Sequence, residues 1–173
     1  MKRLVFVLPL LAAVPALAAV SEPAGLSPEL RAPAGEQPAF VLQAQGVQIY
    51  TCKQSTVDAY AYNWVFVAPD ATLREGEAVV AHHGAGPVWE SASDGSSVKG
   101  AVRQKQDGGA GNIPWLLLAG TPAAHEGRFS GVTSIQRVAT HGGAEPTAVC
   151  DASRMGQEER VPYTADYYFY KRG

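Results

Sequence analysis

Cysteine, charge and long apolar stretches are all scarce in this sequence of 173 residues. Its two cysteines lie far apart, which argues against the closely spaced ligands of a zinc or redox motif. Charged residues make up only 17% of the chain and its lysines and arginines are scattered, so nucleic acid is not expected as a partner. No apolar stretch beyond the N-terminal region is long enough to span a membrane, and the processed protein is expected to be soluble.

The N-terminal region has the three-part pattern of a secretory signal peptide. Lys2 and Arg3 precede an apolar run over residues 4–14, and small residues at Ala16 and Ala18 favour cleavage after Ala18. The apolar run is shorter than the ~20 residues of a membrane-spanning helix, although an uncleaved anchor is the alternative. We therefore expect export to the periplasm or the extracellular medium. Cleavage would leave 155 residues (173 − 18) with a net charge of −4 (12 − 16).

Export determines how the two cysteines are interpreted. In an oxidising compartment Cys52 and Cys150 are expected to form a disulfide, which would close a loop over most of the domain. Free thiols or metal ligands are the alternative, and the wide spacing does not favour them. The chain-entropy model gives such a bridge roughly 4–5 kcal/mol of stabilisation, less any strain.

Period-two patterns of β-branched and aromatic residues dominate the chain after residue 38. The first extended run covers residues 40–52 and is interrupted by Gly46, a candidate bulge. The second covers residues 60–67 and is expected to end at Pro69-Asp70, with room for one helical turn after it. Asp94-Gly95 is a hairpin signal. Further strands are predicted over residues 77–83, 88–90, 97–104, 113–119, 131–139 and 164–171, and residues 153–160 could form a short helix.

These patterns predict an all-β protein with about eight strands and at most short helices. The expected architecture is a single-domain antiparallel sandwich or a small closed β-barrel with one disulfide. Residues 1–18 are assigned to the signal peptide, residues 19–37 to a proline-rich extended arm, and residues 38–173 to the β domain. The arm could lie on the domain or be a loose linker, because its regularly spaced prolines exclude only a long helix or a central strand.

Several ordered segments together resemble a known family. The segments are residues 45–52, 64–66 with 68–73, 82–90 with 94–96, 113–118, 135–138 with 142–143, Cys150, and 162–170. In this order they resemble the family called domain of unknown function 3455, and the similarity runs from about Pro38 to Tyr170. The resemblance implies an exported protein of bacterial or fungal type without an assigned activity, so no catalytic residues carry over.

Some fungal members of that family carry a malate dehydrogenase label, which this sequence does not support. A dinucleotide site needs a strand, a glycine-rich turn and a helix in one unit. Here Gly84-Ala85-Gly86 is followed by Pro87 and then by a predicted strand. No cofactor is therefore expected.

The densest group of residues able to carry chemistry lies between residues 82 and 96. On a strand His82 and His83 point to opposite faces, so they are not expected to share a metal ion, and no metal site is predicted. Either could act as a general base, although a hydrogen-bonded structural histidine is the simpler interpretation. Glu90 and Asp94 could form an acid–base pair, but the turn chemistry of Asp-Gly is the stronger explanation of Asp94.

Among the three tryptophans, Trp89 is the strongest candidate for a ligand-binding ring. Trp64 and Trp115 stand in apolar surroundings and are expected in the core. Trp89 lies next to a Gly-Pro turn and a glutamate, so core and pocket positions are both open. His82 is a second, weaker ligand-binding candidate.

Three functional hypotheses follow from these residues. The first is a non-catalytic exported module that binds a small molecule, a glycan or an envelope partner. The second is a secreted hydrolase that uses His82 or His83 with Glu90 or Asp94. The third is a structural envelope protein. The sequence leaves the oligomeric state open.

Overall fold

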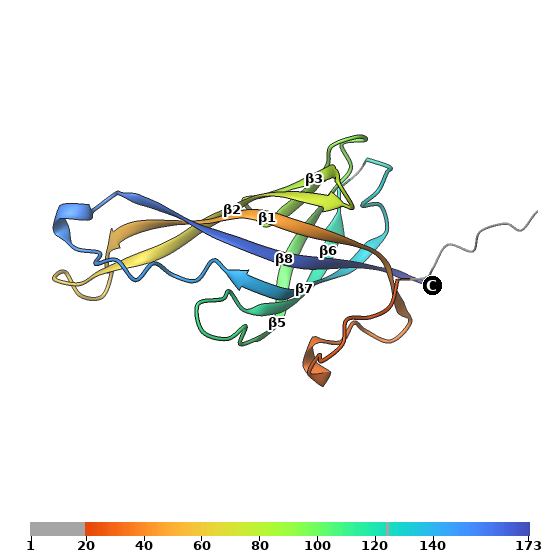
Figure 1. Cartoon of the computed structure of the whole chain (residues 1–173), viewed down its shortest axis with the longest axis horizontal. Helices are drawn as coiled ribbons and strands as arrows, with labels where there is room; N and C mark the ends of the chain where they lie inside the picture. Colours follow the sequence, from red (N-terminus) through yellow and green to blue (C-terminus); the bar gives the residue numbers. More distant parts are fainter. Residues whose placement is uncertain (1–19, 124) are drawn as a thin grey trace, which may run out of the picture.

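The described part of the chain folds into eight antiparallel strands and two short 3-10 helical turns (Figure 1). The computed structural model describes residues 20–123 and 125–173, so the predicted signal peptide lies outside the described residues. The elements are η1 (Pro28–Leu30), β1 (Glu36–Gln54), β2 (Tyr62–Glu75), β3 (Ala78–Gly84), β4 (Val88–Ser91), β5 (Ser97–Gln106), β6 (Trp115–Pro122), β7 (Val132–Gly142), η2 (Ala152–Arg154) and β8 (Glu158–Arg172). Neither helical turn in these ranges has the length and hydropathy needed to cross a membrane.

The strands form a closed barrel in which each strand pairs with its sequence neighbours. The longest ladder joins the first strand to the last, from Glu36 opposite Arg172 to Thr51 opposite Glu158. Closure pairs both edges of the sheet in the body of the barrel, whereas residues 62–70 of β2 pair with β1 alone. The all-β prediction is confirmed, and of the two expected architectures the barrel is the one that forms.

The up-and-down order places alternate connections at opposite ends of the barrel. The turns at residues 55–61, 85–87, 107–114 and 143–157 lie at one end, which we call the open end. The connections at residues 76–77, at 92–96, and at 123 with 125–131 lie at the other end, which we call the closed end.

Aromatic side chains fill the barrel interior near the closed end. The rings of Phe40 and Phe169 stack with their centroids 4.8 Å apart. Phe129, from the turn before β7, packs against both rings at 5.8 and 5.1 Å. The Arg128 guanidinium lies over the Phe40 ring, 5.5 Å from its centroid. The interior at this end is therefore occupied by the protein's own rings.

At the open end β1, β2 and β8 extend past the other strands as a long projection (Figure 1). Cys52 of β1 forms the predicted disulfide with Cys150, with the two Cα atoms 5.5 Å apart. The indole N–H of Trp64 donates a 2.8 Å hydrogen bond to the carbonyl of Ala148. These contacts hold the segment before β8 against the β1–β2 hairpin.

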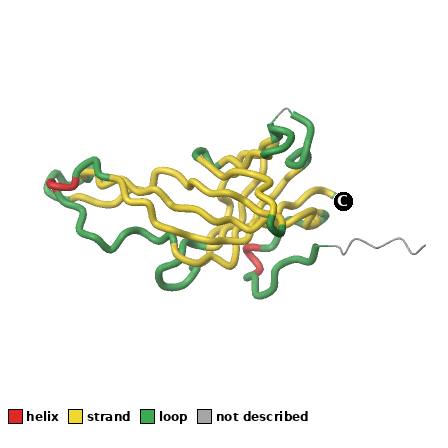
Figure 2. Tube along the Cα trace, turned by 45° about the horizontal axis from the view of Figure 1, so that its top comes forward, coloured by secondary structure: helices red, strands yellow, loops and turns green. Residues whose placement is uncertain are grey.

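The N-terminal arm contacts the outer surface of the barrel through Leu30, which is 1% exposed. The Leu30 carbonyl accepts a 2.6 Å hydrogen bond from Nε2 of Gln136, and Oε1 of Gln136 accepts one from the Tyr170 hydroxyl. Figure 2 shows η1 outside the strands, beneath one side of the barrel. The short helical turn also contacts β5 and β6. Leu117 and Leu118 of β6 are both buried, as the unbroken apolar run predicted.

The second strand is longer than the sequence predicted. Its expected end at Pro69-Asp70 was wrong, because β2 continues to Glu75 and no helical turn forms there. The proline is tolerated beside an irregularity in the β1–β2 ladder, in which Val67 is the extra residue.

Two further local predictions were also wrong. Gly46 is not a bulge, because it pairs in regular register with Ala71. A Cβ at Gly46 would lie 2.2 Å from the carbonyl oxygen of Asp70, so the glycine permits a close approach of two strands. The short helix expected over residues 153–160 reduces to η2, because β8 already begins at Glu158.

Candidate functional site

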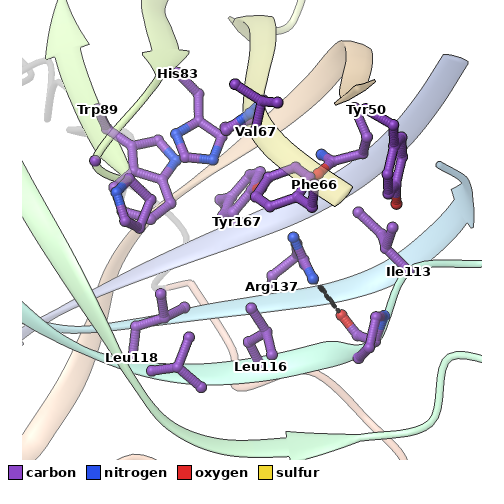
Figure 3. Close-up of a pocket in the computed structure, with 16 residues that line it drawn as sticks. Tyr50, Phe66, Val67, His83, Trp89, Ile113, Leu116, Leu118, Arg137 and Tyr167 are labelled. Atoms are coloured by element: carbon purple, nitrogen blue, oxygen red, sulfur yellow. Dashed lines mark hydrogen bonds between the residues drawn. The ribbon is translucent and has the colours of Figure 1, made fainter. Parts of the chain in front are cut away.

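The open end of the barrel leads into a cavity of about 390 Å³. This volume falls in the range of small-molecule sites, which are roughly 300–1,000 Å³. All eight strands contribute to the walls, together with the β3–β4 and β5–β6 turns. The lining residues are Gln48, Tyr50, Phe66, Val67, Pro69, His83, Gly86, Pro87, Trp89, Val102, Ile113, Pro114, Leu116, Leu118, Arg137 and Tyr167. Figure 3 shows aromatic and aliphatic side chains from several strands around a common space.

Three rings form one wall of the cavity. His83 and Trp89 stack face to face, with centroids 4.2 Å apart and planes 4° from parallel. Tyr167 presents its ring edge-on to both, at 5.3 Å. His83 and Trp89 are directly opposite each other in the β3–β4 ladder, and this pairing brings their rings together. The structure therefore makes Trp89 both a core residue and a lining residue, while its role in binding stays a prediction.

His83 is a neutral imidazole at neutral pH. Its Nδ1 lies 2.9 Å from the carbonyl oxygen of Val88 and therefore carries the proton, which leaves Nε2 as an acceptor. Burial lowers the pKa of His83 to about 4, because the charged form would lose its hydration. The ring can accept a hydrogen bond but is a weak base at neutral pH.

Arg137 is the one lysine, arginine or acidic residue among those that line the cavity in the described chain. It stands on β7 directly opposite Leu116 of β6 and Tyr167 of β8. Its Nε and Nη2 donate hydrogen bonds of 3.1 and 2.8 Å to the Pro114 carbonyl oxygen. The cavity thus combines apolar walls with one fixed positive charge.

The mouth of the cavity is apolar and accessible. Phe66 and Val67 of β2 are 49% and 48% exposed, and Val102 of β5 is 57% exposed. These side chains lie at the open end, where a molecule entering the barrel would pass them. Half-exposed apolar residues around a cavity are typical of a ligand-binding mouth.

The structure separates most of the residues that the sequence suggested as catalytic. His82 and Glu90 are opposite each other in the β3–β4 ladder, and both are exposed on the outer surface. His83 is buried on the inner surface, so the two histidines face opposite sides, as the strand alternation predicted. The ladder therefore brings His82 and Glu90 together outside the cavity, and it places the ring of His83 on the other side of the sheet from Glu90.

Asp94 lies in the turn between β4 and β5, at the closed end. One of its carboxylate oxygens accepts a 2.8 Å hydrogen bond from the Ser96 N–H, and the other accepts a 3.0 Å bond from the Arg128 N–H. Hydrogen bonds from Ser96, followed by that of the Arg128 backbone, hold the pKa of Asp94 well below its usual range. The carboxylate joins two turns of the barrel end opposite the cavity mouth.

Sequence reasoning missed the role of Arg137 and of the β1 residues Gln48 and Tyr50 in the cavity wall. The signal that could have found Arg137 is its position two residues after Ile135 in a predicted strand. Residues two positions apart on a strand share a face, so Arg137 lies on the same face as the apolar Ile135. Which face is interior depends on the barrel register, which the sequence did not provide.

The described residues contain no group of three histidine, cysteine or acidic side chains that could hold a metal ion. The fold and the cavity define a class: an antiparallel eight-stranded barrel with an apolar chamber that opens at one end. The family model for a protein of unknown function, DUF3455, matches residues 33–80 and 74–171, so the chain belongs to that family, as the sequence segments indicated. No curated protein and no solved structure matches significantly.

Proposed function

We propose that the protein binds a small, largely apolar molecule inside its barrel. The observation that carries the proposal is the cavity of about 390 Å³, which aromatic and aliphatic side chains line with only a few polar groups. Burial of apolar surface is the main source of affinity in such sites, and the few polar groups orient the ligand. This lining favours a compact apolar ligand over a glycan, whose many hydroxyls would each need a partner.

The hydrolase hypothesis has less support from the same residues. A general base needs a partner placed within hydrogen-bonding reach and a pKa close to the working pH. His83 has a pKa of about 4, and the lining contains no carboxylate to pair with it. Its stacking on Trp89 and its bond to Val88 favour a structural and ligand-contacting role.

The test uses N-phenyl-1-naphthylamine, a neutral probe whose fluorescence rises in apolar surroundings. We expect it to bind the wild-type protein and to raise its melting temperature, since a ligand that binds only the native state stabilises it. Val102→Trp should block the mouth and weaken binding. Val79→Trp is the matched control, because Val79 is also an exposed strand valine (40%) but does not line the cavity. Equal binding by the two variants, or no binding by the wild type, would overturn the proposal.

We also infer that the protein works outside the cytoplasm. The Cys52–Cys150 disulfide is compatible with an oxidising compartment, and the N-terminal residues have the pattern of a signal peptide. Mass spectrometry of the protein from its native host should find a chain that begins at Ala19 and has no free thiol. A chain that retains Met1 would contradict signal cleavage, and two thiols that alkylate without reduction would contradict an oxidising compartment.

A further inference from the structure

The guanidinium of Arg137 occupies an unusual position for an arginine. The residue is on the inner surface of β7, and Figure 3 shows its side chain in the space between Tyr167 on one side and Leu116 on the other. An arginine on the inside of a barrel gives up part of its hydration, which costs free energy unless another charge compensates. The positive charge of Arg137 therefore requires a compensating group.

Within the described ranges no carboxylate forms an ion pair with Arg137. The ion pairs found there join Arg128 to Glu75 and Arg160 to Asp70. Burial, and after it the charge of Glu145, raises the pKa of Tyr50, so Glu145 lies near the cavity. It does not reach Arg137 within ion-pair distance. The positive charge in the cavity wall is therefore uncompensated by direct contact.

Hydrogen bonds hold the guanidinium in place but do not use all of its N–H groups. Two of its five N–H groups, on Nε and Nη2, bond to the Pro114 carbonyl, and this shared acceptor fixes the plane of the group. The other three N–H groups make no hydrogen bond of standard geometry to a described residue, although the Tyr167 hydroxyl lies within reach of the guanidinium. A planar guanidinium with free N–H groups matches the two oxygens of a carboxylate.

The inner surface of the barrel also carries several buried hydrogen-bond donors. Nε2 of Gln48, Nε1 of Trp89 and the hydroxyls of Tyr163 and Tyr167 are buried and make no hydrogen bond of standard geometry in the described chain. The Tyr167 hydroxyl lies within hydrogen-bonding reach of Tyr163 and Arg137, and the Tyr163 hydroxyl within reach of Gln48, although none of these pairs has standard bond geometry. Amide and indole N–H groups can only donate, and burial raises the pKa of both tyrosines, so they keep their protons.

A buried donor without a partner costs about 1–3 kcal/mol, so a ligand that supplies acceptors gains affinity at this place. The remaining walls are apolar. Figure 3 draws Leu116 and Leu118 below Arg137, Ile113 to its right, and the rings of His83 and Trp89 to its upper left. One arginine balances one negative charge, which favours a monoanion over a doubly charged phosphate.

We propose that the natural ligand is an apolar monocarboxylate, with its carboxylate on the guanidinium of Arg137 and its hydrocarbon body against the rings and leucines of the cavity. This inference rests on the proposed binding function and names the chemical class of its ligand. Arg137 is then the residue that determines specificity, and the apolar walls supply most of the affinity.

The test compares 2-naphthoate with 2-naphthamide, which have nearly the same size and shape but differ in charge. Each is titrated against the wild-type protein as a competitor of N-phenyl-1-naphthylamine. We expect the carboxylate to bind about ten- to a hundredfold more tightly, which is the range that a charge-assisted hydrogen bond gives. Arg137→Met should remove that preference and leave the binding of the amide within a few fold of wild type. Arg160→Met is the charge-matched control, because Arg160 lies outside the cavity lining.

Glu145→Gln provides an additional measurement that does not disturb the guanidinium. Removing a nearby negative charge should strengthen naphthoate binding and leave naphthamide binding unchanged. If wild-type protein binds both compounds equally, the inference is wrong although the proposed binding function stands. If neither compound and no neutral probe binds, the proposed function itself fails. The comparison of naphthoate with naphthamide in the wild-type protein tests the carboxylate preference even if Arg137→Met does not fold.

Discussion

His83 is the residue whose protonation should affect stability most directly. Its pKa is about 4 in the folded barrel, against 6.5 for an exposed histidine, because burial penalises the charged ring. Between these values the unfolded chain binds a proton that the folded chain does not. The contribution of His83 to the free energy of unfolding is therefore fully present above about pH 6.5, and it is lost as the pH falls toward 4. The full difference corresponds to roughly 3 kcal/mol.

Replacing this histidine should flatten the pH profile. We expect His83→Phe, which can keep the stacking on Trp89, to lose less stability than wild type between about pH 7 and about pH 4.5 in urea unfolding. The carboxyl of Asp94 contributes only below its ordinary value of 3.8. Burial raises the pKa of Asp166, so that carboxyl adds stability as the pH falls, but it does so equally in both proteins. The difference between the two slopes therefore reports His83. His82→Phe, on the exposed face, is the control. Identical slopes for wild type and His83→Phe would refute the assignment.

Gly100 is the residue that allows Trp89 to pack against β5. A Cβ at this position would lie 2.8 Å from a ring carbon of Trp89 and 2.9 Å from a methyl carbon of Leu118. Gly100→Ala should therefore displace the indole and destabilise the barrel by about 1–3 kcal/mol, the usual cost of overpacking. Urea unfolding and tryptophan fluorescence would measure both effects. Gly84→Ala is the matched control, because nothing lies within 4 Å of its Cβ, and equal stability of the two variants would contradict this packing.

Among the elements, the N-terminal arm is the one whose role the sequence left most open. Leu30 is 1% exposed against the barrel, whereas Leu26 of the same arm is only partly buried. Leu30→Ala should cost about 2–4 kcal/mol of the free energy of unfolding, as for other buried leucines, and Leu26→Ala clearly less. Chemical denaturation of the two variants makes the comparison. If both variants are as stable as wild type, the arm is a loose linker in solution.

The sequence predicted the strands well where alternation alone determines them. It indicated that His82 and His83 face opposite sides. It also indicated that the run over residues 113–119 has buried side chains on both faces, as Leu117 and Leu118 do. It failed where pairing with a distant strand decides the outcome. β2 passes through Pro69 because a bulge at Val67 and the long β1 partner absorb the proline, and neither feature is local. The inward position of Arg137 depends on the same non-local register.

At the scale of the whole molecule, one part of the barrel interior is packed with side chains and the other part contains the cavity. The rings of Phe40, Phe129 and Phe169 fill the closed end, and the cavity occupies the part nearer the open end. Asp94 and its hydrogen bonds connect two turns at the closed end, far along the strands from the mouth. Substitutions at the closed end should therefore act on folding, and those at the mouth on ligand access.

The disulfide acts on the entire chain, because it joins β1 to the segment just before β8. Its two cysteines are 98 positions apart, so the closed loop contains β2 to β7. A loop of that length should stabilise the native state by about 4–5 kcal/mol, mainly by restricting the unfolded chain. The double variant Cys52→Ala/Cys150→Ala should melt at a clearly lower temperature in circular dichroism. Below that temperature it should still bind N-phenyl-1-naphthylamine, because neither cysteine lines the cavity. An unchanged melting temperature would mean that the unfolded chain is already compact without the bridge, whereas lost binding in a folded variant would mean that the projection at the open end shapes the cavity.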